Sequence, residues 1–389
     1  MQAASPSLSI SSNWIINRQT DLIWFIGGAL GGYLLMFMYE GLGWDMVTIW
    51  FFWVALIDTP HFFGTYSRTY LDKQEFKQRK PLLLWSLLWF VAGPVVVLVC
   101  FIIFKAGSTN YETPWIIFTS FFGIWAYWHV VRQHYGFLAL YKKKNNETST
   151  FDYKLDSSLL YAGLMLPFLV FIVRFPDASS LTTPIVGWFE SWLPITVVEL
   201  VTWVTLTTIG VLALLYIWRQ WSLMKQGIPL NLPKALFLLA VIPLHIFICF
   251  SDAVVEAGIF AFGAFVTIFH DLQYHAIVWF HHKNRYKKAR NRSDYGISAW
   301  LSKSLSRYAL IAIGMGVLFR VLGCTFEVHP GCIPIAVTSN VTLFADFGTD
   351  KLLQGILLGL ALHHYFLDQF IWKTSKDKEL AKDLKLKTA

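Results

Sequence analysis

The chain has 389 residues, of which 56% are hydrophobic and only 14% charged, about half the charge density of an ordinary soluble domain. This composition argues against a soluble cytosolic fold, excludes intrinsic disorder, and predicts a multi-span membrane protein. The net charge of +8 is typical of the cytoplasmic rim of such proteins, so we expect no nucleic-acid partner. Four cysteines are too few for a disulfide framework. Cys100 and Cys249 are expected to be small buried hydrophobes, whereas Cys324 and Cys332 could pair across one loop.

Apolar stretches long enough to cross a hydrocarbon core of about 30 Å predict an all-α bundle of ten transmembrane helices. We expect a single integral-membrane domain over residues 1–389, because no repeat or Gly/Ser linker marks a second one. Residues 1–20 form a short polar N-terminal segment without the features of a signal peptide, and 374–389 form a basic tail. The predicted spans lie near 22–39, 45–64, 82–104, 114–138, 157–175, 196–218, 235–251, 254–280, 305–323 and 352–372.

Lysine and arginine gather in alternate loops, and such loops stay on the cytoplasmic side. The loops after the second, fourth, sixth and eighth predicted spans are basic, as is the tail. This alternation predicts that both termini are cytoplasmic. The stretch 324–350 becomes the longest outer loop, and 283–304 becomes a basic inner loop that could lie on anionic headgroups.

Nine of the eleven histidines fall in four short clusters, each near the C-terminal end of an even-numbered predicted span. Those ends all lie on the cytoplasmic side in the predicted topology. Ionisable groups near hydrocarbon depth are costly unless they pair, line water or bind metal, so the clusters predict a functional site. They lie at Asp58–His61, His129–His134, His270–His282 and His363–Asp368, while His245 and His329 stand apart.

Spacing along a helix decides which side chains share a face, because each residue turns by about 100°. Asp58 with His61, Asp271 with His275, and His364 with Asp368 are three or four residues apart and lie on one face. His129 and His134, like His270 and His275, are five apart and about 140° from each other. Such a pair could straddle two metals, or a π-bulge could bring its members together. Pro60 predicts a kink in the second span.

Imidazole with carboxylate is the ligand set expected for iron, manganese or zinc. Asp271, Arg132 and Gln133 are expected to support the ligands, although Arg132 could equally be a snorkelling cation. His281 and His282 adjoin a basic run at the membrane edge, where an interfacial role competes with ligation. His245 is expected to be a packed histidine. The predicted metal ligands are Asp58, His61, His129, His134, His270, His275, His363, His364 and Asp368.

These clusters resemble the histidine boxes of integral-membrane non-haem iron oxygenases, the class of membrane fatty-acyl desaturases and of alkane, sterol and carotenoid hydroxylases. The two boxes with four intervening residues and the pairs His281–His282 and His363–His364 are similar to boxes in that class. The chain also resembles bacterial β-carotene dioxygenases associated with bacteriorhodopsin-type pigments. In that comparison, His363 or His364 with Asp368 looks like their His-to-Asp motif.

Both resemblances imply that dioxygen is activated by iron, one or two Fe(II) ions with two favoured, held by neutral imidazoles. Asp58, Asp271 and Asp368 would complete the ligand shell or orient the rings. They also imply a lipid or isoprenoid substrate that enters from the membrane and a cytosolic electron donor, which could dock on residues 283–307. The main alternative is a metal-ion or proton-coupled transporter, in which the same residues would bind a passing ion. A haem-binding protein or a scaffold is a third possibility.

Overall fold

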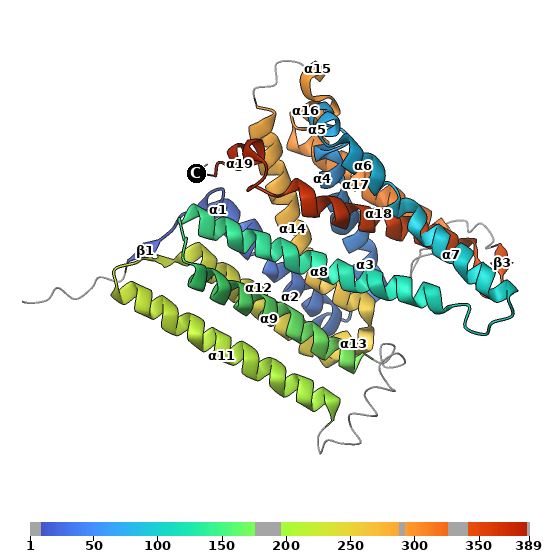
Figure 1. Cartoon of the computed structure of the whole chain (residues 1–389), viewed down its shortest axis with the longest axis horizontal. Helices are drawn as coiled ribbons and strands as arrows, with labels where there is room; N and C mark the ends of the chain where they lie inside the picture. Colours follow the sequence, from blue (N-terminus) through green and yellow to red (C-terminus); the bar gives the residue numbers. More distant parts are fainter. Residues whose placement is uncertain (1–8, 176–195, 288–291, 326–340, 387–389) are drawn as a thin grey trace, which may run out of the picture. The chain divides into compact units, whose positions relative to one another are not determined.

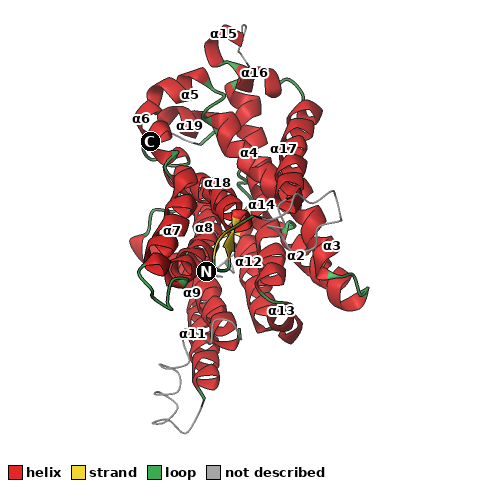
Figure 2. Ribbon diagram, turned by 90° about the vertical axis from the view of Figure 1, so that its right-hand side faces the viewer, coloured by secondary structure: helices red, strands yellow, loops and turns green. Residues whose placement is uncertain are grey.

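The computed structural model describes residues 9–175, 196–287, 292–325 and 341–386, and these are almost entirely helical (Figure 2). The predicted all-α class is therefore confirmed. Two short strand pairs interrupt the helices: β1 (Ile10–Ser11) runs parallel to β2 (Leu230–Asn231), and β3 (Thr342–Phe344) runs antiparallel to β4 (Phe347–Gly348). The predictions for His329, for Cys332 and for most of the loop 324–350 fall outside the described residues.

Six helices of the described residues are long and apolar enough to cross a membrane, and a bent pair, Arg18–Ile26 with Ala29–Gly41, brings the number to seven if it is one span. Long helices also cover the predicted spans 114–138, 254–280 and 352–372, but these are less apolar. The count of ten spans and the cytoplasmic termini stay predictions. The six spans are Met46–Arg68, Lys80–Lys105, Thr150–Arg174, Val197–Lys225, Leu232–Phe250 and Leu305–Cys324.

The chain forms two compact units, so the single domain expected from the sequence stays a prediction. Unit 1 comprises Met1–Met46 and Val131–Gln273, and unit 2 comprises Val47–Val130 and Tyr274–Ala389. Two long helices, α8 (Thr113–Lys144) and α14 (Ile259–Arg285), contribute residues to both. The other helices of unit 1 are α1 (Arg18–Thr20), the π-helical η1 (Asp21–Ile26), α2 (Ala29–Met36), the π-helical η2 (Phe37–Gly41), α9 (Thr150–Arg174), α11 (Val197–Lys225), α12 (Leu232–Phe250) and α13 (Asp252–Ala257).

In unit 1, α9 packs between α11 and α12, as Figure 1 shows. The crossing of α9 and α12 requires a glycine, because a Cβ on Gly163 would lie 2.8 Å from Ile242 Cγ1. Three buried charges join the α8 end to the same helices. The carboxylate of Asp156 accepts hydrogen bonds from the ammonium groups of Lys142 and Lys234.

In unit 2, α7 packs closely along α18, and Figure 1 shows the two helices side by side. A Cβ on Gly93 would lie 2.3 Å from Gly355 Cα, and one on Gly359 would lie 2.6 Å from the Trp89 carbonyl oxygen. Only glycine allows this approach. The helices of unit 2 besides α8 and α14 are α3 (Met46–Trp53), the π-helical η3 (Val54–Asp58), α4 (Thr59–Arg68), α5 (Lys73–Gln78), α6 (Lys80–Ser86), α7 (Trp89–Lys105), α15 (Arg292–Tyr295), α16 (Ile297–Leu301), α17 (Leu305–Thr325), α18 (Thr349–Ile371) and α19 (Lys378–Asp383).

The second span is irregular at the place where the sequence predicts a kink. The π-helical η3 ends at Asp58, and α4 begins at Thr59 with Pro60 in its first turn, where a proline needs no backbone N–H. Against this break packs α17, where a Cβ on Gly316 would lie 2.2 Å from the Ala55 carbonyl oxygen. The break therefore sits in a tight crossing directly before the first histidine, His61.

The cysteines divide as the sequence predicts. Cys100 and Cys249 are buried and free. Cys324 is disulfide-bonded, and its expected partner, Cys332, lies outside the described residues.

Candidate metal centre

Four of the predicted ligands come together inside unit 2. They are His61 on α4, His129 on α8, and His364 with Asp368 on α18, and all four side chains are buried. Three helices thus supply nitrogen and oxygen donors that lie near His364, and these are donor types that protein metal sites use.

The rings of His61 and His364 face each other through their Nε2 atoms, which are 3.1 Å apart. The ring planes are nearly perpendicular, at 80°. Two imidazole nitrogens that each bind one metal ion at about 2.1 Å, with an angle of about 90° between the two metal–nitrogen bonds, would be about 3.0 Å apart. The same separation also suits an N–H···N hydrogen bond between the rings. Which nitrogen of each ring carries the proton decides between a metal site and such a hydrogen bond.

The hydroxyl of Thr65 lies between His364 and Asp368 and favours one tautomer of the His364 ring. Thr65 donates its hydrogen to Asp368 Oδ1 at 2.8 Å, and its oxygen lies 2.7 Å from His364 Nδ1. With its own hydrogen given to the carboxylate, the hydroxyl oxygen accepts from Nδ1–H. The lone pair of His364 is then on Nε2, the atom that faces His61.

Asp58 acts on His61 from the opposite side of that ring. The Oδ1 atom of Asp58 lies 3.8 Å from His61 Nδ1, which is ion-pair distance but too long for a hydrogen bond. A carboxylate there favours the tautomer with its proton on Nδ1 and leaves a lone pair on Nε2. Two lone pairs that face each other at 3.1 Å repel unless a cation lies near both. This arrangement fits a metal ion.

His129 and Asp368 form a second group of possible ligands around His364. One ligand atom from each of His129, His364 and Asp368 falls within a group whose members are all within 4.8 Å of one another. The His129 ring stacks on Tyr365 with centroids 4.7 Å apart, and its centroid is 4.9 Å from that of His364. Packing against Tyr365 therefore restricts the orientation of the His129 ring.

The carboxylate of Asp368 is held by two hydroxyls that the sequence pattern does not single out. Tyr274 donates to Asp368 Oδ1 at 2.9 Å, and its oxygen is 2.6 Å from Thr65 Oγ1. The indole N–H of Trp372 donates to the same Tyr274 oxygen at 3.3 Å. Thr65 could have been identified from the sequence, because it follows His61 by one helical turn and lies on the same face of the helix.

Two other predicted ligands in unit 2 have different partners. His363 has Tyr66 OH at 3.1 Å from Nδ1, and Tyr70 OH and Ser86 Oγ at 2.9 and 3.0 Å from Nε2, so hydroxyls occupy both ring nitrogens. His275 Nε2 lies 3.1 Å from the carbonyl oxygen of Ile57, to which it can donate. Neither residue belongs to the group around His364, and their assignment as ligands stays a prediction.

The remaining predicted residues belong to unit 1. His134 is buried beside Phe269 and His245, with ring centroids 5.0 and 5.5 Å away. His245 is thus a packed histidine, as expected. Arg132 donates a hydrogen bond to Tyr161.

Gln133 donates to the backbone oxygen of His270 at 2.8 Å, and both His270 and Asp271 are buried. Because α8 and α14 are regular α-helices at their histidine pairs, no π-bulge draws His134 toward His129 or His275 toward His270. The π-helical segments of the described residues lie elsewhere, at Asp21–Ile26, Phe37–Gly41 and, in the second span, Val54–Asp58.

His281 and His282 are buried at the end of α14, next to a cluster of charges. His281 Nε2 lies 3.5 Å from Asp383 Oδ2, and His282 Nε2 lies 3.5 Å from Ser67 Oγ. Burial lowers the pKa of both imidazoles well below the usual value, and the nearby guanidinium of Arg68 acts in the same direction. Both rings are therefore neutral at neutral pH.

Comparison of the chain with models of known protein families, with curated proteins and with solved structures finds no match. The function must therefore be argued from the geometry of unit 2.

Proposed function

We propose that this chain is a membrane-embedded non-haem iron oxygenase that acts on a lipid or isoprenoid chain. The observation that carries the proposal is the pair of Nε2 atoms of His61 and His364, which lie 3.1 Å apart. On the other side of the rings, Thr65 Oγ1 lies 2.7 Å from His364 Nδ1, and Asp58 Oδ1 lies 3.8 Å from His61 Nδ1. We assign His61, His129, His364 and Asp368 as iron ligands.

Iron bound by such a donor set would supply the activation of dioxygen for desaturation, hydroxylation or oxidative cleavage. The protein's own part is to hold and orient. Thr65 keeps the His364 proton on Nδ1, and Tyr274 fixes the carboxylate of Asp368. Such partners of metal ligands typically change metal affinity or activity by about 10–100-fold when they are removed.

Burial of the donors supports an apolar substrate. His61 and His364 are 2% and 0% exposed, so the centre is shielded from bulk water. A chain that carries spans of hydrocarbon length offers such a centre to a substrate dissolved in the membrane. The cytosolic electron donor, the cytoplasmic depth and a second iron bound by further histidines stay predictions from the sequence.

Iron quantitation and Mössbauer spectra of the full chain, purified without chelator after growth on iron-57, test the proposal. We expect about one or two irons per chain in the wild type and loss of most of that iron in His61→Ala and in His364→Ala. His363→Ala is the matched control, because hydroxyl groups already occupy both nitrogens of this neighbouring histidine. Equal iron in all four proteins would refute the ligand assignment.

Activity needs a second measurement. Oxygen consumption by the iron-loaded chain, with a chemical reductant and isoprenoid or fatty-acyl lipids in nanodiscs, should depend on His61, and mass spectra should identify the oxidised lipid. The transporter alternative predicts a different result, in which metal exchanges freely and crosses proteoliposome membranes without oxygen consumption.

A further inference from the structure

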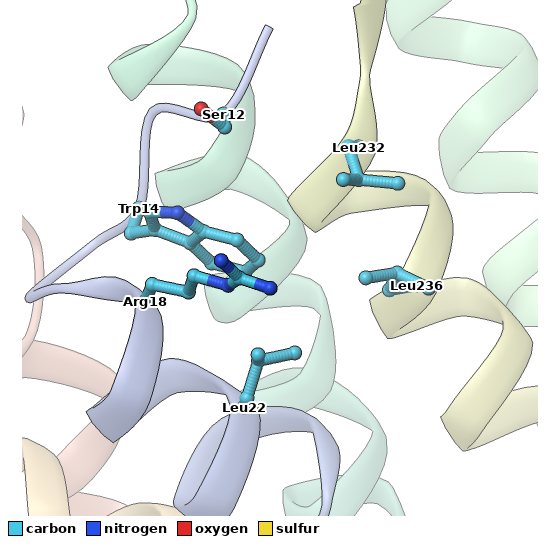
Figure 3. Close-up of a pocket in the computed structure, with 6 residues that line it drawn as sticks. All are labelled: Ser12, Trp14, Arg18, Leu22, Leu232 and Leu236. Atoms are coloured by element: carbon cyan, nitrogen blue, oxygen red, sulfur yellow. The ribbon is translucent and has the colours of Figure 1, made fainter. Parts of the chain in front are cut away.

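A second feature with unused polar groups lies in unit 1. A cavity of about 300 Å³ is lined by Ser12, Trp14, Arg18, Leu22, Leu232 and Leu236. Figure 3 shows the Trp14 and Arg18 side chains both extending toward Leu232 and Leu236. The volume is at the lower end of the range for small-molecule sites, enough for a headgroup and the start of an acyl chain.

The backbone builds this cavity where α12 and the bent helix pair begin, both of them long and apolar enough to cross a membrane. Strand β1 pairs in parallel with β2, with Ile10 opposite Leu230 and Ser11 opposite Asn231. The chain after β2 enters α12 at Leu232, and the chain after β1 enters the bent pair of helices at Arg18. The strand pair therefore sets the first turns of both helices side by side, at the end where each apolar helix begins.

Three hydrogen-bond donors at the cavity have no partner among the described residues. They are the hydroxyl of Ser12, the indole N–H of Trp14 and the guanidinium of Arg18. Arg18 is also exposed, so its charge is available to a ligand. The rest of the lining consists of leucine side chains, and this combination of one cation, further donors and an apolar wall fits an amphipathic anion.

We propose that this cavity binds an anionic phospholipid, with the phosphate on Arg18 and Trp14 and the first acyl methylenes on Leu22, Leu232 and Leu236. Arginine presents a planar fork of donors that matches a phosphate in two-point geometry. Tryptophan is enriched at the headgroup level, where its ring lies in the apolar phase and its N–H faces the polar one.

Native mass spectrometry of the full chain, with dioleoyl phosphatidylglycerol or dioleoyl phosphatidylcholine added in matched amounts, tests this site. We expect the wild type to retain phosphatidylglycerol about tenfold better than phosphatidylcholine. Arg18→Gln should reduce phosphatidylglycerol binding by about tenfold or more, the loss expected when a hydrogen bond to a charged group is removed. Its fold should persist because Arg18 is exposed, and an unchanged unfolding midpoint without lipid will check this.

Lys225→Gln is the matched control, because Lys225 is also an exposed cation beside a tryptophan at a helix end, 5.4 Å from the Trp221 ring, but does not line the cavity. Leu236→Gln should weaken the binding of both lipids, since it removes part of the apolar wall. Equal retention of the two lipids, or no effect of Arg18→Gln, would overturn the proposal. So would Arg18-dependent stabilisation by inorganic phosphate as large as that by the lipid, which would identify a free anion as the ligand.

Discussion

Replacing Asp156 by asparagine should destabilise unit 1 strongly. Asp156 lies on α9 and is fully buried, and its Oδ2 accepts from Lys142 and, at 3.0 Å, from Lys234. Glu147 completes the cluster with a 2.8 Å contact to Lys234. The neutral amide in Asp156→Asn would leave two buried ammonium groups to share the one carboxylate of Glu147.

The size of the effect follows from the geometry. Two unit charges 3.0 Å apart attract each other by about 5.5 kcal/mol at an effective dielectric constant of about 20. The lysines remain desolvated in the variant, so little of that attraction is regained. Breaking a buried ion pair from one side typically costs about 3–5 kcal/mol, and we expect a loss in this range. That corresponds to a fall in the unfolding midpoint on the order of 10 °C.

Tryptophan fluorescence during heating, at one scan rate in one detergent, measures this effect. Asp252→Asn is the control. The Asp252 carboxylate pairs with Arg174 but is 85% exposed, so its loss should leave the unfolding midpoint unchanged. Adding Lys142→Met to Asp156→Asn should recover part of the stability, since it removes one stranded charge. A midpoint for Asp156→Asn within about a degree of the control, or a further loss in the double variant, would refute the reasoning.

Three further variants test the helix crossing, the metal centre and the buried histidines. Thr65→Val should weaken iron binding by about 10–100-fold, measured by chelator competition, because His364 loses the group that fixes its tautomer. Gly355→Val should cost about 1–3 kcal/mol in thermal unfolding, since even a Cβ at Gly355 lies 2.9 Å from the backbone of Gly93. Burial holds the pKa of His282 well below its usual value, so the folded state stays neutral while the unfolded chain binds a proton as the pH falls below about 6.5. The free energy of unfolding should therefore decrease as the pH is lowered from 7 to 5. In His282→Gln, this decrease should be smaller by up to about 1.4 kcal/mol per pH unit.

Matched controls accompany these variants. Thr69→Val removes a buried hydroxyl that donates to the Thr65 carbonyl oxygen, and iron affinity should hardly change. Gly314→Val adds the same side chain where a Cβ meets nothing within 4 Å, and stability should be kept. If a control lost as much iron affinity or stability as its test variant, the loss would be a general effect of the substitution and not of the proposed contact. An identical pH slope in His282→Gln and wild type would mean that this ring is protonated in the folded protein.

Much of the fold follows from the sequence because apolar length alone fixes the helices. In the second span, the sequence predicts part of the local structure but not all of it. Pro60 predicts a kink, but the π-helical turn at Val54–Asp58 depends on the packing of α17 at Gly316, which local sequence does not specify. Spacing places Asp58 and His61 on one face, yet it cannot say which helix that face meets.

The hydroxyls of the site were missed for a related reason. Threonine and tyrosine in a membrane helix have many ordinary roles, so residue type alone does not single out Thr65 or Tyr274. They acquire one only when α4, α14 and α18 meet and both oxygens reach Asp368. Histidine is costly at hydrocarbon depth and therefore stands out, whereas the groups that orient it do not.

The pair His363–His364 illustrates how helix packing can assign different roles to identical neighbours. Gly355, Gly359 and His363 are spaced by four residues, so they form one stripe along α18. The two glycines meet the backbone of α7, and the stripe brings the His363 ring to Ser86 and, at 5.2 Å between centroids, to Phe90. His364 lies about 100° further round the helix.

That rotation, with a further turn to Asp368, directs His364 and the carboxylate toward α4 and His61. The glycine stripe is visible in the sequence as a small-xxx-small pattern, the usual sign of a close helix crossing in membranes. Because the stripe commits His363 to the face that meets α7, it favours His364 as the ligand of the pair. The same reasoning predicts that a bulky residue at Gly355 would disturb the metal centre through the position of α18, with every ligand still present.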